Sequence, residues 1–511
     1  MPLFTPPEHI VYILDRLVEN GYEAYLVGGC VRDAVMGRAA NDWDIATSAY
    51  PEDVASLFER SLPTGARYGT VTVLVPKTHA GDGSTCLESD GHALTQPVAE
   101  NVRYHTVEVT TFRADGEYRD GRRPVSVEFV SGLKDDLRRR DFTINAIAAT
   151  VEGDLIDPFG GLEDINDRVI RCVGIPDARF KEDALRMFRA YRFSAELDFS
   201  IEPGTLSAIY SNAAAATQIS AERIQTELEK TLMSRKPEIA GSMIKAGLLR
   251  GEFGIRNSEF GITASEDDGG NSEFGIRNSE LLWREDGDNS EFGIRNSELL
   301  FRNGDSLGSL LSRIADLPAE TVLRWCAFCA VLLDQGLIQS CAQLLRSLRL
   351  DTKTVKNCKA GIEITQEIIQ ISMASGWEPG GVTPQKSESS IQALDPEGEW
   401  SGTQNSEFRI PNSEFRIPVK RLLAKNGTDA VRCAAAAAEI LYRVPAVALT
   451  DEIIISGECF SLKQLAISGR ELIALGHKPG PDMKKTLNDL LYHVIERPMD
   501  NIREVLLSLV K

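Results

Sequence analysis

Residues 24–45 read AYLVGGCVRDAVMGRAANDWDI, and this stretch decides the fold. It begins as a short strand, passes through Gly28 and Gly29, and takes on a helical pattern from Val31. Paired glycines let a backbone approach phosphate closely, and a helix start presents free N–H groups to an anion. A plain tight turn would account for Gly-Gly equally well. With Arg32 in the first helical turn, the segment is interpreted as a phosphate-binding loop.

Two carboxylates follow this loop after a short interval. Asp42 and Asp44 are two residues apart, and residues i and i+2 of a strand face the same side, so both are predicted to point to one place. Two like charges are costly there unless a cation lies between them, and Mg²⁺ prefers carboxylate and phosphate oxygens. An Asp-x-Asp pair alone is more often a solvated turn. Directly after a phosphate loop, a magnesium site is the better interpretation.

A third carboxylate lies in the alternating run TVEVTTFR. Glu108 is expected to share a face with Thr106 and Thr110, because the two intervening valines point the other way. In isolation, a strand glutamate is an ordinary solvent-facing residue. Beside the two aspartates it would complete a set able to hold two metal ions about 4 Å apart, which would activate a hydroxyl nucleophile and stabilise a triphosphate.

Length and composition limit the classes of protein to which this chain can belong. A chain of 511 residues suggests three or four domains. No run of eighteen apolar residues and no signal-peptide pattern is found, so no membrane association is expected and the cytoplasm is the predicted compartment. The net charge of −19 argues against binding nucleic acid through bulk charge, so RNA binding would need a local basic surface.

The nine cysteines are scattered and odd in number, which argues against a disulfide framework. Cys326 and Cys329 form one C-x-x-C within an apolar helical stretch that carries no second pair and no histidine. Both are expected to be buried core thiols.

Repeats interrupt the chain. EFGIRNSE occurs at 252–259, 273–280 and 291–298, and NSEFRIP occurs at 405–411 and 412–418. Because the spacing is irregular, these copies predict low-complexity, largely disordered insertions rather than a solenoid; a binding tract is the alternative.

The predicted fold is α+β, an α/β head followed by an all-helical remainder. The boundaries expected from the sequence are an α/β head at 1–155, a helical segment at 156–250, a repeat insert at 251–304, a helical body at 305–375, a linker at 376–418 and a helical tail at 419–511.

The segment from Leu26 to Val54 resembles the head motif of the class II tRNA nucleotidyltransferases, the CCA-adding enzymes and their bacterial poly(A) polymerase relatives. Further segments agree in order, among them DLRRRDFTINAIA, LIDPFGGLEDINDRVIRCVG and RFKEDALRMFRAYRFSAELDFSIE. The resemblance covers nearly all of 20–235, and 466–490 is similar to the tRNA-gripping region of the CCA-adding branch.

The resemblance implies a nucleotidyltransferase head, a base-recognising neck, and a body and tail that hold tRNA. It also implies roles for residues. The catalytic acids would be Asp42, Asp44 and Glu108, with Mg²⁺ on Asp42 and Asp44, and the nucleotide would be bound by Gly28, Gly29, Arg32, Arg140, Asp183, Arg186, Arg189 and Arg192.

The spacing of the last four of these residues also fits a role in base recognition without the resemblance. Asp183, Arg186 and Arg189 are three residues apart and would line one helix face, with Arg192 slightly around it. A salt-bridged surface face is the plain alternative. An aspartate and an arginine together offer the acceptor and the donor that complement the edge of cytosine or adenine.

The implied activity is addition of CMP and AMP, from CTP and ATP, to the tRNA 3′ end. A polar loop at 113–124 favours full CCA or A-only addition over CC addition, and no protein partner is predicted. The alternatives are an A-adding enzyme or poly(A) polymerase of the same family and, from another class, a non-catalytic RNA-binding protein. A metal phosphohydrolase should show clustered histidines, whereas the six histidines are dispersed. The segment 78–101, which contains His79 and His92, is longer than this resemblance predicts.

Overall fold

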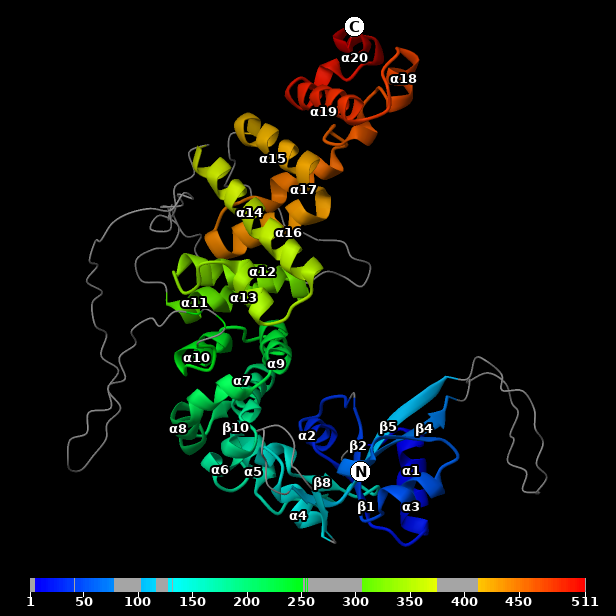
Figure 1. The fold of residues 1–511 in the computed structure, drawn as a ribbon. Coiled ribbons are helices and arrows are strands. Elements are labelled where there is room, and N and C mark those ends of the chain that lie inside the picture. Colours follow the sequence, from blue (N-terminus) through cyan, green and yellow to red (C-terminus); the bar gives the residue numbers. More distant parts are fainter. Residues whose placement is uncertain are drawn as a thin grey trace, which may run out of the picture. The chain divides into compact units, whose positions relative to one another are not determined.

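The computed structural model describes residues 5–40, 42–77, 103–115, 127–130, 132–250, 253, 255, 306–374 and 412–510. The chain divides into two compact units, Met1–Glu227 with Ala246–Leu248, and Leu228–Lys245 with Leu249–Lys511 (Figure 1). The expected insert at 78–101, most of the polar loop at 113–124 and the repeat copies at 273–280, 291–298 and 405–411 lie outside the described residues.

A seven-stranded mixed sheet lies at the centre of the first unit, in the order β3-β4-β5-β2-β1-β8-β9. Its only parallel pair of strands is β2 with β5. The strands are β1 (Ala24–Val27), β2 (Asp44–Thr47), β3 (Ser61–Gly65), β4 (Thr70–Pro76), β5 (Tyr104–Thr111), β8 (Ala148–Ala149) and β9 (Leu155–Ile156). The predicted α/β head is confirmed.

Apolar periodicity explains how helices cover this sheet. Helix α1 (Glu8–Glu19) buries Ile10, Ile13, Leu14 and Leu17, which recur at helical spacing and form one stripe. Other buried side chains join the strands to helix α4, among them Val27, Ala46, Phe112, Leu133 and Leu137. Helices α2 (Gly29–Val35), α3 (Pro51–Leu57) and α4 (Leu133–Arg138) and the 3₁₀ turns η1 (Ala66–Tyr68) and η2 (Thr143–Asn145) belong to this part.

Helices dominate the rest of the first unit. They are α5 (Gly161–Asp167), α6 (Pro176–Glu182), α7 (Leu185–Leu197), α8 (Pro203–Asn212), η3 (Ala213–Gln218) and the greater part of α9 (Ala221–Met233). Short strand pairs also occur, β6 (Arg113–Asp115) with β7 (Val127–Phe129) and β10 (Val169–Ile170) with β11 (Ser200–Ile201). The segment 156–250 is therefore not purely helical as predicted, because β10 and β11 pair in parallel across the intervening helices.

The second unit is helical in its described residues. It contains the end of α9 and α10 (Ile239–Lys245), α11 (Leu307–Ser312), η5 (Arg313–Asp316), α12 (Thr321–Asp334), α13 (Cys341–Ser347), α14 (Thr352–Ala374), α15 (Asn412–Asn426), α16 (Thr428–Tyr442), α17 (Val447–Ile455), η6 (Leu462–Gln464), α18 (Gly469–Ala474), α19 (Pro481–Glu496), η7 (Pro498–Asp500) and α20 (Arg503–Val510). The chain after the head is therefore mostly helical, and the short strands β10 and β11 are its departure from the all-helical prediction. No helix among the described residues is both long and apolar enough to cross a membrane.

Helix α12 buries two cysteines and one arginine. Cys326 and Cys329 are buried in α12, as predicted. Arg324 of α12 is also buried, and its guanidinium donates to five backbone carbonyls near the ends of α9 and η5, those of Leu232, Ser234, Ala315, Leu317 and Pro318. One side chain thus donates to several carbonyls at the ends of helical segments, where the helix itself leaves acceptors over.

The second NSEFRIP copy corrects a sequence prediction. Residues 412–418 were expected to end a linker, but they form the first turns of α15. Phe415 is completely buried, and the guanidinium of Arg416 pairs with Glu452 and Glu458. An aromatic anchor and a paired cation therefore give this copy tertiary contacts that the repeat pattern alone does not indicate.

Candidate active site

The glycine turn joins β1 to α2. Gly28 has φ +79°, a left-handed conformation that favours glycine, and it directly precedes Gly29, the first residue of α2. The helix therefore starts two residues earlier than the sequence suggested. A β-carbon on Gly28 would lie 3.0 Å from Nη1 of Arg140 and 3.9 Å from Oδ2 of Asp44. Both groups thus lie against this backbone, and glycine keeps the space between them open.

The carboxylates lie where β2 begins. The Cα atom of Asp44 pairs in register with Val27 of β1 on one side and with Glu108 of β5 on the other. Because β2 and β5 are parallel neighbours, Asp44 and Glu108 project from the same face of the sheet, and both are exposed. The valines on either side of Glu108 are buried, as the alternating pattern predicted.

Asp42 differs from its prediction. It lies in an exposed bend before β2 instead of in the strand. The reason is that β1 ends at Val27 and turns into the glycine loop, so the ladder between β1 and β2 stops at Asp44. Within the described residues, no three His, Cys, Asp or Glu side chains are grouped closely enough to hold a metal ion.

The charges of Asp42 and Glu108 nonetheless influence the pKa of Asp44. Asp44 reaches the surface, but enough protein surrounds it that desolvation raises the pKa of its carboxyl group. The guanidinium of Arg140 opposes this shift, whereas the negative charges of Glu108 and Asp42 add to it. Arg140 itself pairs with the buried carboxylate of Asp136 at 3.3 Å. Negative charge therefore accumulates at the start of β2, beside one cation.

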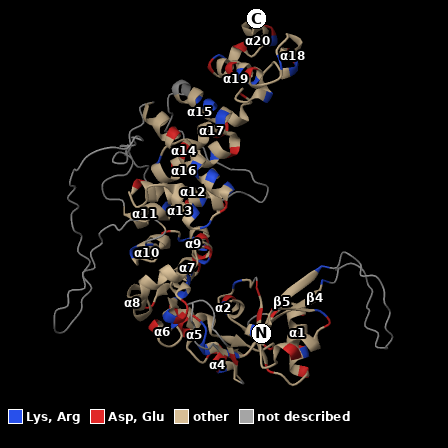
Figure 2. Ribbon diagram, in the orientation of Figure 1, with Lys and Arg blue, Asp and Glu red and all other residues tan. Residues whose placement is uncertain are grey.

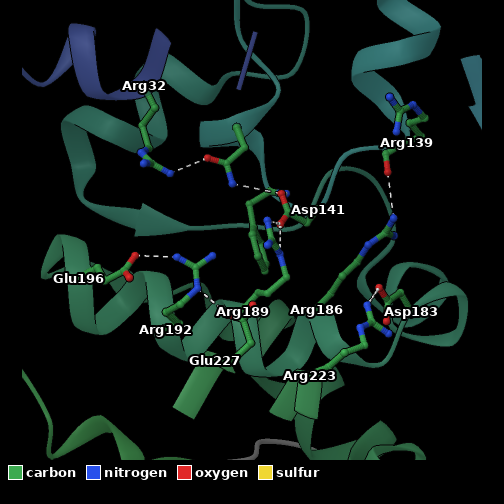
Figure 3. A network of polar contacts seen from close by, with 12 residues as sticks. Arg32, Arg139, Asp141, Asp183, Arg186, Arg189, Arg192, Glu196, Arg223 and Glu227 are labelled. Carbon is green, nitrogen blue, oxygen red and sulfur yellow. Dashed lines mark hydrogen bonds and ion pairs between the residues drawn. The ribbon is translucent and has the colours of Figure 1, made fainter. Parts of the chain in front are cut away.

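Arg32 enters a buried network that crosses the unit (Figure 3). Its Nη1 donates to Oδ1 of Asn145 at 2.8 Å, and Asn145 donates to Asp141 at 3.1 Å. Asp141 also accepts a hydrogen bond from Arg189 of α7 at 2.7 Å. Burial alone would raise the pKa of Asp141, but Arg189 and Asn145 outweigh it and hold that pKa well below its usual value. Arg32 and Arg189 are thus connected through two side chains, those of Asn145 and Asp141.

Asp183 does not lie on one continuous helix with the arginines that follow it. Helix α6 ends at Glu182, and Asp183 is extended, with its Oδ1 accepting the backbone N–H of Leu185 at 3.0 Å. This local bond ends one helix and starts the next, so the predicted common face is wrong for Asp183. Its Oδ2 accepts Arg223 of α9 at 2.7 Å instead of pairing with Arg186 (Figure 3).

Arg186, Arg189 and Arg192 all lie on α7, as predicted. Arg186 donates to Glu182 at 2.6 Å and to the backbone oxygen of Arg139 at 3.0 Å. Arg192 pairs with Glu196 and with Glu227 of α9. The guanidinium groups of Arg32, Arg189 and Arg192 also lie 5.2, 5.2 and 3.9 Å from the centre of the Phe193 ring. Positive charge is therefore concentrated around one buried aromatic ring.

Three family models match the chain in sequence order. The poly A polymerase head domain matches residues 24–171, the RNA and SrmB-binding site of polymerase A matches 198–253, and the tRNA nucleotidyltransferase domain 2 matches 430–510. Together they cover more than half of the 511 residues. The chain belongs to the class II tRNA nucleotidyltransferase family.

Curated members of this family are similar over part of their length. The CCA-adding enzyme of Limosilactobacillus reuteri is 42% identical over 254 residues, which are 49% of this chain and 56% of that protein. The CCA-adding enzyme of Geobacillus kaustophilus is 48% identical over 227 residues, 44% of this chain and 50% of that protein. The chain thus spans about half the length of the curated relatives that it matches.

Solved structures of the family share the fold. The crystal structure of the Bacillus stearothermophilus CCA-adding enzyme in complex with CTP is 26% identical, with a TM-score of 0.62 over 99% of this chain and 97% of that chain. A Thermotoga maritima CCA-adding enzyme complexed with tRNA has a TM-score of 0.55 at 17% identity, covering 99% of this chain and 96% of that one, and shares the fold.

The family suggests a divalent metal, and the residues at the start of β2 fit one. The neighbouring Asp44 and Glu108 offer hard oxygen ligands, and a cation would relieve the repulsion from Glu108 and Asp42 that adds to the effect of desolvation on the pKa of Asp44. Asp42 supplies a third carboxylate that is already near enough to influence Asp44.

Several network residues were missed in the sequence. Asp141 and Asn145 are four residues apart in RRRDFTINA, where a buried polar pair between apolar side chains was a usable signal. The sequence carries no comparable signal for Glu227 and Arg223. Their partners, Arg192 on α7 and Asp183 beside α6, lie 35 and 40 residues away.

Proposed function

We propose that this chain is a CCA tRNA nucleotidyltransferase, which adds CMP and AMP from CTP and ATP to the tRNA 3′ end and releases pyrophosphate. The observation that carries this proposal is the register of β2 with β5, which sets Asp44 beside Glu108 next to the Gly28 turn. The identities of 42–48% with curated CCA-adding enzymes support it.

The residues suit distinct tasks in this reaction. The Gly28–Gly29 turn and the Arg140 guanidinium would bind the triphosphate, because a close backbone approach and a cation meet there. Asp44 and Glu108 would hold Mg²⁺ once Asp42 moves in from the bend before β2 to complete the set, and the ion would lower the pKa of the attacking hydroxyl and neutralise the leaving group. Arg32 and Arg189 would fix the loop relative to α7 through Asn145 and Asp141.

Base selection is assigned to the region between α6 and α7. Asp183 accepts two hydrogen bonds in the structure, and a carboxylate has about four acceptor positions, so it can accept the exocyclic amine of cytosine or adenine without releasing Arg223. Arg186, held by Glu182 and the Arg139 carbonyl, would provide the donor, and Arg192 would add positive charge.

The proposal keeps the division into head, neck, body and tail and places the protein in the cytoplasm. The eight described cysteines are free thiols, which suits a reducing compartment.

The test is extension of tRNA lacking its 3′ CCA, with Mg²⁺ and CTP, ATP or both, followed on a sequencing gel. Asp44→Asn should slow extension by roughly a hundredfold or more, because the metal loses its ligand at the start of β2. Glu52→Gln, at an exposed acid of α3, is the matched control and should extend at the wild-type rate.

The products separate the alternatives. Addition of C, C and A supports the proposal, addition of A alone supports an A-adding enzyme, and a long A tail supports a poly(A) polymerase. A wild-type chain that binds tRNA but incorporates no nucleotide would be a non-catalytic RNA-binding protein, and the proposal would be wrong.

A further inference from the structure

The C-x-x-C of α12 has no part in the proposed reaction, yet it lies where three helices pack together. Cys326 and Cys329 are buried on α12, and Cys341 of α13 and Cys358 of α14 are buried as well. Helices α12, α13 and α14 are in contact with one another. Over residues 325–333 the sequence of α12 has no charged residue, so this stretch is tan in Figure 2. Four thiols therefore meet at an apolar interface, and we call them the thiol cluster.

One pair of the thiol cluster joins α12 to α14. The side chains of Cys326 and Cys358 are hydrogen-bonded to each other. In addition, Sγ of Cys326 lies 3.3 Å from the backbone oxygen of Cys358, and Sγ of Cys358 lies 3.6 Å from the backbone oxygen of Val322. Each sulfur atom is therefore held against the backbone of the opposite helix.

Gly361 of α14 makes room for this pair. A β-carbon at this position would lie 2.7 Å from Sγ of Cys326. Glycine is an unfavourable residue in the interior of a helix, and Gly361 lies in the middle of α14. The approach of the Cys326 thiol gives a physical reason for a glycine at this point.

The other pair joins α12 to α13. Cys329 donates a hydrogen bond to Cys341, and this bond lowers the pKa of Cys341 although burial opposes the shift. Cys341 begins α13 directly after a turn in which Gln335, Gly336 and Gln339 are exposed. It is 6% exposed, whereas Cys329 is fully buried. Cys341 is therefore the more readily ionised thiol of the pair and the one nearer to solvent, and the thiolate is the nucleophilic form of cysteine.

We propose that the thiol cluster is an oxidation site for hydroperoxides, at which Cys329 joins Cys341 and Cys326 joins Cys358 in two disulfide bonds. Thiols that already contact one another need only a short approach to form such a bond. The bridges would tie α12 covalently to both of its neighbours, and thiol–disulfide exchange would reverse them. The inference goes beyond the proposed function and does not depend on it.

The reaction balances with one hydroperoxide for each bridge. The thiolate of Cys341 attacks the outer oxygen of the hydroperoxide; an S–O bond forms, the O–O bond breaks, and the other oxygen takes a proton and leaves as an alcohol, or as water from hydrogen peroxide. The thiol of Cys329 then attacks the sulfenic acid sulfur, so that an S–S bond forms, the S–O bond breaks and water leaves. Two thiols thus lose two electrons and two protons. Cys326 and Cys358 react in the same sequence of steps.

The test is mass spectrometry of the full chain after treatment with hydrogen peroxide. Remaining thiols are blocked with N-ethylmaleimide, and the chain is cut with chymotrypsin, which cleaves after Phe328 and so separates Cys326 from Cys329. We expect linked peptides that join Cys329 to Cys341 and Cys326 to Cys358. Four of the nine thiols should be lost in forming them, and a reductant should restore these four.

Two cysteines of the first unit are matched controls within the same sample. Cys30 and Cys172 are also buried, but Cys30 bonds to the backbone oxygen of Val27 and Cys172 is hydrogen-bonded to Thr205. Because these contacts are not with a second thiol, both cysteines should stay reduced.

Single substitutions separate the two bridges. Cys341→Ser should abolish the bridge to Cys329 and leave the bridge between Cys326 and Cys358. Cys358→Ala should have the converse effect, and circular dichroism establishes that each variant is folded.

Thermal unfolding gives a second readout. The Cys326–Cys358 bridge would close a loop between residues 32 positions apart, which constrains the unfolded chain. The oxidised wild type should therefore unfold at a temperature higher by roughly 5 to 10 °C, and reduction should reverse the gain. Each variant, with one bridge, should show a smaller rise.

Several results would overturn the inference. One is any other pairing within the thiol cluster, or a bridge from Cys326 to the neighbouring Cys433 of α16. Another is oxidation confined to Cys433 and Cys459, the partly exposed thiols, because exposure alone would then decide reactivity. Oxidation of Cys30 and Cys172 to the same extent as the cluster would contradict it as well.

Discussion

Asp334 shows how a single residue can tie the stability of the second unit to pH. It ends α12, and its carboxylate accepts the hydroxyl of Tyr442, the last residue of α16. Burial raises the pKa of Asp334 to about 6, and the hydrogen bond from Tyr442 only partly offsets that shift. The native state therefore prefers the protonated acid more strongly than the unfolded chain does.

The sign of the resulting pH dependence follows from the raised pKa. The contribution of Asp334 to stability is complete below pH about 4 and is lost as pH rises through about 6. Asp334→Asn keeps an acceptor for Tyr442 and removes the charge. In urea unfolding at pH 7.5 the variant should be more stable by roughly 2–3 kcal/mol, and near pH 4 the difference should vanish.

The matched control for this prediction is Asp316→Asn, at an exposed acid of the same unit, which should change the free energy of unfolding by less than about 0.5 kcal/mol. A gain for Asp334→Asn that is the same at both pH values would show that packing, and not titration, is responsible.

At the scale of elements, the contact between α5 and η2 depends on one glycine. Gly161 starts α5, and Asp157 accepts its N–H at 2.9 Å and that of Leu162 at 2.8 Å. A β-carbon on Gly161 would lie 2.2 Å from the backbone oxygen of Thr143. The 3₁₀ turn η2 that contains Thr143 also contains Asn145, the partner of Arg32.

Gly161→Ala should therefore force α5 away from η2. We expect a loss of about 2–3 kcal/mol in the free energy of unfolding, measured with urea, together with weaker nucleotide binding, because Asn145 moves. Gly132→Ala is the control: its β-carbon would meet only Asp135 Oδ2, at 3.8 Å, and its φ is an ordinary −116°. Equal stability of the two variants would contradict the close contact.

Elements with a clear period could be predicted from the sequence, and those fixed by distant partners could not. The strand around Glu108 alternates, so its two faces were readable. The end of the β2 ladder at Asp44 depends on where β1 turns, which no local pattern around Asp42 reveals. Likewise, the bond from Arg32 to Asn145 joins residues 113 positions apart. The break at Asp183 had a local cause, but helical spacing on both sides concealed it.

At the scale of the whole molecule, the division into two units predicts a local response to the nucleotide that we propose as substrate. The glycine turn, the carboxylates and α7 all belong to the first unit. CTP with Mg²⁺ at 100 times its Kd should stabilise that unit by about 2.7 kcal/mol. Hydrogen exchange should slow in β2 and β5 and stay unchanged in α12 and α14.

Asp44→Asn provides the control for this response, because it removes the proposed metal ligand while the second unit keeps its sequence. Protection by CTP should be much smaller in that variant. Equal protection of α12 and α14 by CTP in the wild type would contradict a nucleotide site confined to the first unit.

The duplicated heptad at the start of α15 has a consequence for the gene. The copy at 412–418 supplies Phe415 and Arg416 to the second unit, and 405–411 has the same seven letters. Seven codons are a whole number of triplets, so losing or gaining one unit preserves the reading frame. After such an event the helix would still receive an identical aromatic anchor and cation. A change in the number of copies at this junction would therefore leave unaltered the residues that dock α15.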